Sequence, residues 1–296
     1  MRFRNIFWLL VANIYSRIVF FFHRRFDIKL PGLGRLLDRI DADLILSIEG
    51  QKLWCNPAIA RSCSSYINGE FLELDIHKFL TAIMEYLNLN VDLGNSSGIQ
   101  FVDVGCHVGE MIIDMARYCN VVSLVAFEPE LQCYSACEQT VALNAYKQVE
   151  LRQLALKEDF SPAYLVIDEK SLSGSRLSTG TPEGELVAAS TLDFEIPDYI
   201  GAAIVKIDVE DAELRVLQGA KLYLKRNLPL VIFEYNEISK AHFSLDQVVE
   251  LLGTGYQIFR LREDRNLGSL KNRAWNCVAV HHESVFWNTC QSLIYD

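Results

Sequence analysis

Two acidic residues and two glycines have the types and the spacing needed to hold a nucleoside. Asp103 lies near the end of an apolar run that begins at Ile99, and Gly105 and Gly109 follow it closely. Glu128 follows the next apolar run. Glycines let the chain turn sharply and approach a ligand, and an acid at the end of the second strand can accept hydrogen bonds from ribose hydroxyls. This pattern predicts a site for a ribose-containing ligand.

The glycine spacing separates two cofactors that contain a nucleoside. Dinucleotide-binding proteins need Gly-x-Gly-x-x-Gly, in which the second glycine makes room for the pyrophosphate. Here His107 stands at that position. S-adenosylmethionine (AdoMet) carries no phosphate, so it is better matched by a wider turn with an acid ahead of it. The residues expected to bind AdoMet are Asp103, Gly105, Cys106, His107, Gly109, Glu128 and Pro129.

Glu128 also has a purely structural interpretation. It stands immediately before Pro129, at the start of a predicted helix. The helix macrodipole favours an acid at that place. We favour ribose binding, because the acid and the glycine turn occur together.

Strands and helices alternate from Ile99 onward, which is typical of a mostly parallel sheet covered on both faces. The last two strands, at 257–261 and 275–281, lie too close in sequence for a crossover, so a hairpin with an antiparallel final strand is expected. The sequence therefore predicts an α/β, Rossmann-like fold with a seven-stranded, mostly parallel sheet and an antiparallel last strand, plus an N-terminal helical or extended cap. This is the layout of class I AdoMet methyltransferases.

A second group of charged residues follows the fourth predicted strand. Lys206 and Asp208 stand at the carboxyl end of an apolar run, where ligands bind in such sheets. Glu210 follows, and Glu234 ends the next strand. Burying an unpaired charge costs several kcal/mol. Lys206 and Asp208 are therefore expected to pair with each other, with Glu234 or with a substrate. These four residues are the catalytic candidates.

The chain resembles the FkbM family of methyltransferases over about residues 99–281. The shared features are Lys206-Ile-Asp-Val-Glu-Asp-Ala-Glu213, Leu217-Gln-Gly-Ala220, Phe233-Glu234, Thr191-Leu-Asp193 and Asn144. Two departures are Gly105-Cys106-His107, where the family has Gly-Ala-Asn, and Asp211, where the family has Gly. The first departure bears on contacts to the methionine end of AdoMet. The second places a residue with a side chain in a turn where glycine would be less restricted.

The resemblance implies AdoMet-dependent methylation of a hydroxyl on a sugar, a glycan or a secondary metabolite. Positioning the acceptor oxygen in line with the methyl group contributes much of the rate. The hydroxyl must also lose its proton to a general base. Asp208 is the first candidate for this base, and Glu210 and Glu234 are the next candidates. Ser173 and Ser175 resemble the family's serine-rich segment near the substrate, although an ordinary polar loop is an equal interpretation.

Three alternatives stay open at this point. Asp208, Glu234 and Asn236 stand where catechol-type methyltransferases hold a divalent ion, and their oxygen atoms would suit Mg²⁺. A protein that binds AdoMet without turnover would keep the same fold. A nicotinamide-dependent oxidoreductase is the third alternative and the least favoured.

Residues 1–30 differ from the rest, because Ile6 to Phe22 is almost entirely apolar and is flanked by arginines. A secretory signal is disfavoured, since no small-residue cleavage site follows. The run is short for a bilayer span and contains Arg17, which would cost up to roughly 3 kcal/mol at the bilayer centre. We prefer an amphipathic helix, which either docks on the protein or lies on a membrane through residues 1–25.

Three regions are expected: this N-terminal helix at 1–30, a cap at 31–98 and a methyltransferase domain at 99–296 with an insertion at 157–190. The formal net charge of −10 argues against a nucleic-acid partner. The eight cysteines lack the spacing of a zinc site and fit a reducing compartment. Because AdoMet is a cytosolic cofactor, we expect a cytoplasmic location, with membrane association left open. The sequence does not set the oligomeric state.

Overall fold

The computed structural model describes most of the chain. The described residues are 3–26, 36, 39–40, 42–57, 71–90, 98–167, 175–178, 183–270 and 276–295.

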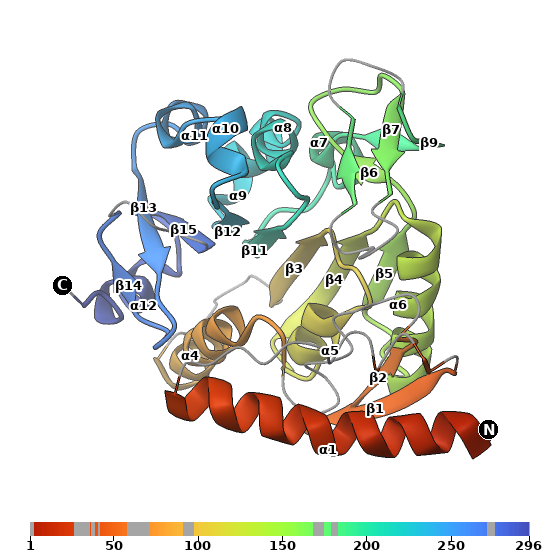
Figure 1. Cartoon of the computed structure of the whole chain (residues 1–296). Helices are drawn as coiled ribbons and strands as arrows, with labels where there is room; N and C mark the ends of the chain where they lie inside the picture. The colour runs from red at the N-terminus through yellow and green to blue at the C-terminus, as the bar shows by residue number, and fades with distance from the viewer. Residues whose placement is uncertain are drawn as a thin grey trace.

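An eight-stranded sheet forms the centre of the protein (Figure 1), in the order β14-β13-β15-β12-β11-β3-β4-β5. The strands are β3 (Ile99–Val104), β4 (Val121–Phe127), β5 (Val149–Arg152), β11 (Ala202–Ile207), β12 (Leu230–Glu234), β13 (Tyr256–Leu261), β14 (Leu267–Gly268) and β15 (Asn276–His281). β15 is antiparallel to both of its neighbours. The predicted mostly parallel sheet with an antiparallel last strand is therefore confirmed.

The eighth strand, β14, was not expected from the sequence. It has only two residues and pairs with β13 through Arg260↔Gly268 and Leu261↔Leu267. Two residues are too few for a periodic hydrophobic pattern. The sequence therefore predicts seven strands where the structure has eight.

The strand order reverses direction between β3 and β11. From β3 the chain proceeds to β4 and β5 on one side, then returns to place β11 and β12 on the other side. Every residue of β3 and of β11 is buried, in agreement with their nearly continuous apolar runs. A crevice for ligands is expected outside the carboxyl ends of strands at such a reversal.

Helices cover both faces of the sheet and bury two hydrophobic clusters against it. One face carries α4 (Leu74–Asn90), α5 (Glu110–Ala116), α6 (Leu131–Asn144) and α12 (Trp287–Ser292). The other face carries α7 (Leu192–Glu195), α8 (Glu213–Gln218), α9 (Lys221–Asn227) and α11 (Leu245–Leu252). A short helix, α10 (Ser239–His242), follows β12.

The stretch after β11 differs from its sequence pattern, which predicts one helix over 211–226. The structure has α8 and α9 instead, separated at Gly219 and Ala220. A Cβ atom on Gly219 would lie 2.1 Å from the carbonyl oxygen of Lys157. The chain therefore bends where another backbone segment passes too close for any side chain.

The region before β3 packs directly on the rest of the fold. α4 contributes Phe79, Leu80 and Ile83 to the same buried cluster as the sheet. The hairpin of β1 (Leu44–Ile48) and β2 (Gln51–Cys55) lies against α6. There the side chain of Asn144 accepts from the Lys52 amide and donates to its carbonyl oxygen, at 2.9 and 2.6 Å. This part of the expected cap thus shares its core with the sheet.

The expected insertion contains a small antiparallel sheet, at the top of Figure 1. β7 (Ala163–Val166) pairs with β8 (Arg176–Leu177) and with β9 (Glu185–Val187). β6 (Ala155–Leu156) and β10 (Ala189–Ser190) form a parallel pair at its base. The insertion expected at 157–190 therefore contains three strands, with β7 paired to both of the others.

α1 (Phe3–Phe26) is a 24-residue helix that lies along the outside of the molecule (Figure 1). None of the described helices combines the length and the apolar character that crossing a bilayer requires. Cys55 is disulfide-bonded, which differs from the expectation that the cysteines fit a reducing compartment. The thiols of Cys106, Cys119, Cys133, Cys137, Cys277 and Cys290 are free.

Candidate cofactor and active site

The turn after β3 brings the ends of three strands together. The amides of Gly105 and Cys106 both donate to the carbonyl oxygen of Phe127, at 2.9 and 3.1 Å, and Phe127 ends β4. A Cβ atom on Gly105 would lie 1.9 Å from the carbonyl oxygen of Asp208, just beyond β11. Gly105 also has a φ of +84°, which disfavours any residue with a side chain. Glycine is therefore required at this position.

Asp103 is a buried acid without a donor. It is completely buried, and among the described residues neither carboxylate oxygen has a hydrogen-bond partner. Burial raises the pKa of Asp103 to about 6, although the charge of Lys206 acts in the opposite direction. Buried polar groups are nearly always hydrogen-bonded in native proteins. Asp103 is therefore suited to accept hydrogen bonds from a ligand.

Glu128 is held in place by two backbone amides. Its Oε2 atom accepts from the His107 amide and its Oε1 atom from the Glu130 amide, both at 2.9 Å. Burial raises the pKa of Glu128 to about 7, against the lowering effect of these hydrogen bonds. Each oxygen of a carboxylate can accept two hydrogen bonds. A fixed carboxylate with remaining acceptor capacity is suited to two adjacent hydroxyls.

The cap of α6 is Glu130 rather than Glu128. The side chain of Glu130 accepts from the Cys133 amide at 2.6 Å. Glu128 precedes the cap and does not perform this role itself. Capping of α6 by a side chain is therefore the role of Glu130, and Glu128 binds the backbone amide of that cap residue.

His107 holds a neutral imidazole beside this carboxylate. Burial lowers the pKa of His107 to about 4, although nearby acids act in the opposite direction. The Nε2 atom is buried and has no hydrogen-bond partner among the described residues. A neutral imidazole can donate from one ring nitrogen and accept at the other. His107 can therefore hydrogen-bond a ligand in this turn but is a weak base.

Lys206 stands at the centre of a cluster of charges. Its Nζ atom lies 2.9 Å from Asp208 Oδ2 and 3.0 Å from Glu73 Oε2. Burial alone would lower the pKa of Lys206, but the charges of Asp208 and Glu73 outweigh it and raise that pKa well above its usual value. The pairing of Lys206 with Asp208 was expected from the sequence. The contribution of Glu73 was not.

A second buried network fixes the segment that carries Glu73. The Oε1 atom of Glu110 accepts from the Leu72 amide at 2.6 Å and lies 2.8 Å from His77 Nε2. The other ring nitrogen of His77 faces Asp114. Burial alone would lower the pKa of His77, but the hydrogen bonds to Asp114 and Glu110 outweigh it and raise the pKa to about 9. A charged His77 therefore joins α4 to α5.

Glu210 and Glu234 supply two further acids. Burial raises the pKa of Glu210 to about 7, and the charge of Glu234 adds to the effect. Among the described residues, none forms a hydrogen bond or an ion pair with the side chain of Glu210. The backbone of Glu210 has a φ of +50°. Burial and the charge of Asp208 also raise the pKa of Glu234, whose Oε2 atom has no hydrogen-bond partner among the described residues.

These groups line one cavity with a volume of about 250 Å³. Small-molecule pockets typically have volumes of about 300–1,000 Å³, so this cavity is close to the lower end of that range. The predicted residues that line it are Asp103, Gly105, Cys106, His107, Glu128, Pro129, Ser175, Lys206, Asp208, Glu210 and Glu234. The lining residues that the sequence did not single out are Leu72, Glu73, Val104, Glu110, Met111, Phe127, Leu154, Ala155, Leu156, Leu165, Leu177 and Val209.

Two predicted site residues among those described do not line this cavity. Gly109 stands at the start of α5, and a Cβ atom there would lie 2.9 Å from the sulfur of Cys137, so it has a packing role. Asn236 lies beyond the cavity lining. Ser173 falls outside the described residues.

The alternative of a divalent ion at Asp208, Glu234 and Asn236 is not supported. The side-chain oxygen of Asn236 accepts from the amides of Ile238 and Ser239, at 2.7 and 3.0 Å. In the described part of the chain, no three His, Cys, Asp or Glu side chains converge in a way that could hold a metal ion. The amide that this alternative would use as a ligand instead shapes the turn before α10.

Comparison with known proteins gives one family and several remote structures. The model of the methyltransferase FkbM domain matches residues 103–259. No curated protein matches the sequence significantly.

The similar solved structures include a methyltransferase FkbM from Methylobacillus flagellatus KT, with 16% identity, 71% of this chain and 55% of that chain covered, and a TM-score of 0.45. An rRNA methylase from Streptococcus thermophilus has 13% identity, coverage of 72% and 98%, and a TM-score of 0.41. TYW2 from M. jannaschii, solved in complex with AdoMet, has 10% identity, coverage of 86% and 88%, and a TM-score of 0.42. The match thus spans 55% of the length of the FkbM methyltransferase structure.

Proposed function

Because the chain belongs to the FkbM family of methyltransferases, whose domain model matches more than half of its length, we propose that it methylates a hydroxyl group with AdoMet. The acceptor class is a sugar, a glycan or a secondary metabolite. AdoMet-dependent methylation follows from the family. The choice of oxygen as the acceptor atom, and the roles of the residues given below, are the proposal.

One observation carries this proposal. The cavity at the strand reversal is lined by Asp103 of β3 and Glu128 just beyond β4, and by Glu210 beyond β11 and Glu234 at the end of β12. The first pair is suited to the hydrogen-bond donors of a nucleoside and an amino acid. The second pair includes an acid whose pKa, raised by burial, lies near neutrality. The cavity thus combines residues suited to AdoMet with an acid suited to accept the proton of a hydroxyl, which supports the proposal.

The residues around the turn fit AdoMet by their hydrogen-bonding chemistry. AdoMet supplies a methyl group on a positively charged sulfur when it is bound. Its ribose hydroxyls and its ammonium group are donors, and Glu128 and Asp103 are buried acceptors with unused capacity. Leu154, Ala155 and Leu156 line the same cavity and offer an apolar surface for the adenine ring of AdoMet.

Glu210 is better suited than Asp208 to take the proton of the acceptor. Asp208 already accepts a hydrogen bond from Lys206 at 2.9 Å, so its carboxylate is engaged by a cation within the protein. No cation among the described residues pairs with Glu210, and burial raises its pKa to about 7. A general base works best when its pKa is close to the working pH. We therefore assign Glu210 as the base and Asp208 as a partner that positions Lys206.

The charge of the cavity favours a neutral acceptor. Among the described residues, the acids Glu73, Asp103, Glu110, Glu128, Asp208, Glu210 and Glu234 line it together with one lysine, Lys206. An acceptor with a phosphate or carboxylate group would meet like charges at short range, which is unfavourable. The hydroxyl of a sugar or a metabolite carries no such charge. Ser175, Leu165 and Leu177 complete the lining from the insertion.

The purified protein incubated with AdoMet labelled in its methyl group and a cell extract tests this function. We expect label in a small molecule or glycan, retained after alkaline treatment because a methyl ether is stable to base. Release of the label as methanol would instead indicate a carboxyl methyl ester, and label on nitrogen would refute oxygen as the acceptor. Glu210→Gln is the matched control. We expect this variant to bind AdoMet with the affinity of the parent but to transfer little of the labelled methyl group.

A ligand titration separates the competing functions. AdoMet is expected to raise the melting temperature, since a ligand that binds only the folded state stabilises it. Stabilisation by NADH alone would refute the methyltransferase. Stabilisation by AdoMet without transfer to any acceptor in the extract would favour the binding protein without turnover.

A further inference from the structure

The outer face of α1 is a stripe of exposed apolar side chains. Its six large apolar residues are each between 42% and 61% exposed. They are Ile6, Phe7, Leu10, Ile14, Ile18 and Phe21. With about 100° of rotation per residue, these six positions fall within about 120° of the helix circumference. They form one continuous surface along the helix, which we call the α1 stripe.

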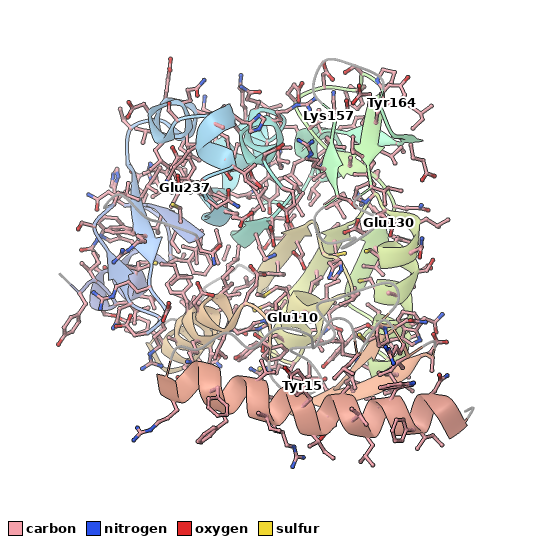
Figure 2. The ribbon with its side chains drawn as sticks, viewed as in Figure 1. Tyr15, Glu110, Glu130, Lys157, Tyr164 and Glu237 are labelled. Atoms are coloured by element: carbon pink, nitrogen blue, oxygen red, sulfur yellow. The ribbon has the colours of Figure 1, made fainter. Side chains whose placement is uncertain are left out.

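The opposite side of α1 contacts the protein. Asn5, Ala12 and Ser16 are buried there, and their helical positions lie almost directly across from the centre of the α1 stripe. Ala12 packs with Ile40 and neighbouring side chains, which include Tyr15. Figure 2 shows Tyr15 on the side of the helix that faces the protein, while other side chains project away from it.

This orientation is the reverse of that found in an ordinary surface helix. Two polar residues, Asn5 and Ser16, are turned inward, and the apolar residues are turned outward. A helix that is apolar on nearly all sides is normally covered on all sides. The protein covers one side of α1, so the α1 stripe requires a second apolar medium.

The charges of this segment identify that medium. All five charged residues among residues 1–26 are arginines, in a chain with a formal net charge of −10. Two of them, Arg17 and Arg25, are exposed, and their positions fall within the same arc as the α1 stripe. A second copy of α1 would bring arginines and no acid to balance them. Anionic lipid headgroups supply negative charge beside an apolar layer.

We propose that the α1 stripe lies in the interface of a membrane that contains anionic lipids, with Arg17 and Arg25 at the level of the headgroups. The helix lies parallel to the membrane plane, because its inner side stays against the protein and no described helix can cross a bilayer. This surface shares no residue with the lining of the catalytic cavity, so the proposal is independent of the proposed function.

Vesicle flotation of the full chain tests the proposal. The probes are vesicles of phosphatidylcholine alone and of phosphatidylcholine with phosphatidylserine. We expect the protein to float with the anionic vesicles, and to float less at high salt because the arginine contribution is screened. A parent protein that stays in solution with the anionic vesicles would overturn the proposal.

Matched variants assign the binding to the α1 stripe. The double change Leu10→Glu and Ile14→Glu should reduce flotation by about tenfold or more, because it places two charges in the apolar layer. The control carries Leu186→Glu and Ile200→Glu, at residues that are 63% and 75% exposed elsewhere on the protein. Equal flotation of both variants would refute the assignment. Cooperative thermal unfolding of each variant, followed by circular dichroism, verifies that it is folded.

Sedimentation of the same proteins separates a membrane from a second copy. A dimer that Leu10→Glu and Ile14→Glu dissociate, in a parent that does not float with vesicles, would show that another chain covers the α1 stripe. Arg17→Gln with Arg25→Gln should lower flotation with anionic vesicles and change it little with neutral ones. An unchanged preference for anionic vesicles would contradict the role of these arginines.

Discussion

The ammonium group of Lys206 lies 3.0 Å from the carboxylate of Glu73. Lys206 belongs to β11, in the middle of the sheet, whereas Glu73 directly precedes α4. Glu73 also lies outside residues 103–259, which the family model matches. The N-terminal part of the chain therefore contributes a charged group to the cavity, and the site is complete only when α4 is packed on the sheet.

The ion pair between Glu73 and Lys206 should be measurable as a coupling. Glu73→Gln is expected to lower the free energy of unfolding by about 1–3 kcal/mol, because it leaves a buried ammonium with one carboxylate fewer. Combined with Lys206→Met, the two changes should depart from additivity by about 0.5–3 kcal/mol. Urea unfolding of the four proteins gives this value. Strictly additive costs would show that the pair is not coupled.

Gly105→Ala should be far more destabilising than Gly50→Ala. Both glycines have a φ of +84°, so both changes carry the same backbone penalty of about 1 kcal/mol. Only at Gly105 would the new Cβ atom meet another atom, 1.9 Å from the Asp208 carbonyl oxygen, whereas nothing lies within 4 Å at Gly50. Thermal unfolding and AdoMet titration compare them. Similar melting temperatures would refute the close approach of the turn to β11.

Glu128→Ala should weaken AdoMet binding by about 1–3 kcal/mol, because charge-assisted hydrogen bonds to the ribose are lost. Isothermal titration calorimetry measures the effect. Glu263→Ala, at an exposed acid of a distant turn, is the control and should bind AdoMet as the parent does. An unchanged affinity of Glu128→Ala would remove Glu128 from the cofactor site.

The pH dependence of turnover should identify the base. With the pKa of Glu210 raised by burial to about 7, the deprotonated fraction increases as the pH rises through 7. The kcat/KM of the parent should therefore increase up to about pH 7 and then level. Glu210→Gln should lower it by about 100-fold or more and abolish the inflection. If Asp208→Asn abolishes the inflection instead, Asp208 is the base.

The stability of the protein should depend on pH through His77. Hydrogen bonds to Asp114 and Glu110 outweigh burial and raise the pKa of His77 from 6.5 in the unfolded chain to about 9. Its stabilising effect is therefore complete below pH 6.5 and is lost as the pH rises from 6.5 through 9. His77→Gln should lower the free energy of unfolding by on the order of a few kcal/mol at pH 6, and by much less at pH 10. Chemical unfolding at both pH values tests this, and a pH-independent difference would contradict a charged His77.

The sequence alone predicted the sheet well, because its strands are long apolar runs separated by helices. The runs at β3 and β11 could be recognised without any tertiary contact. β14 could not, since two residues carry no period, and the break between α8 and α9 depends on the carbonyl oxygen of Lys157, which a sequence pattern does not contain. The orientation of α1 also could not be predicted. The sequence pattern indicates a polar and an apolar side of the helix, but it does not indicate which side faces the protein.

For the site, the sequence by itself determined the residues that local spacing places at the ends of strands. Asp103 and Glu128 follow from consecutive strands of a parallel sheet, because such strands end at the same edge. Tertiary structure alone decided that Glu73 pairs with Lys206 and that Glu130, rather than Glu128, caps α6. Within the described part of the chain, it also left Glu210 without a cation while pairing Asp208 with Lys206. The reason is physical: periodicity fixes which edge a side chain reaches, whereas its charge state depends on partners brought close by long-range packing.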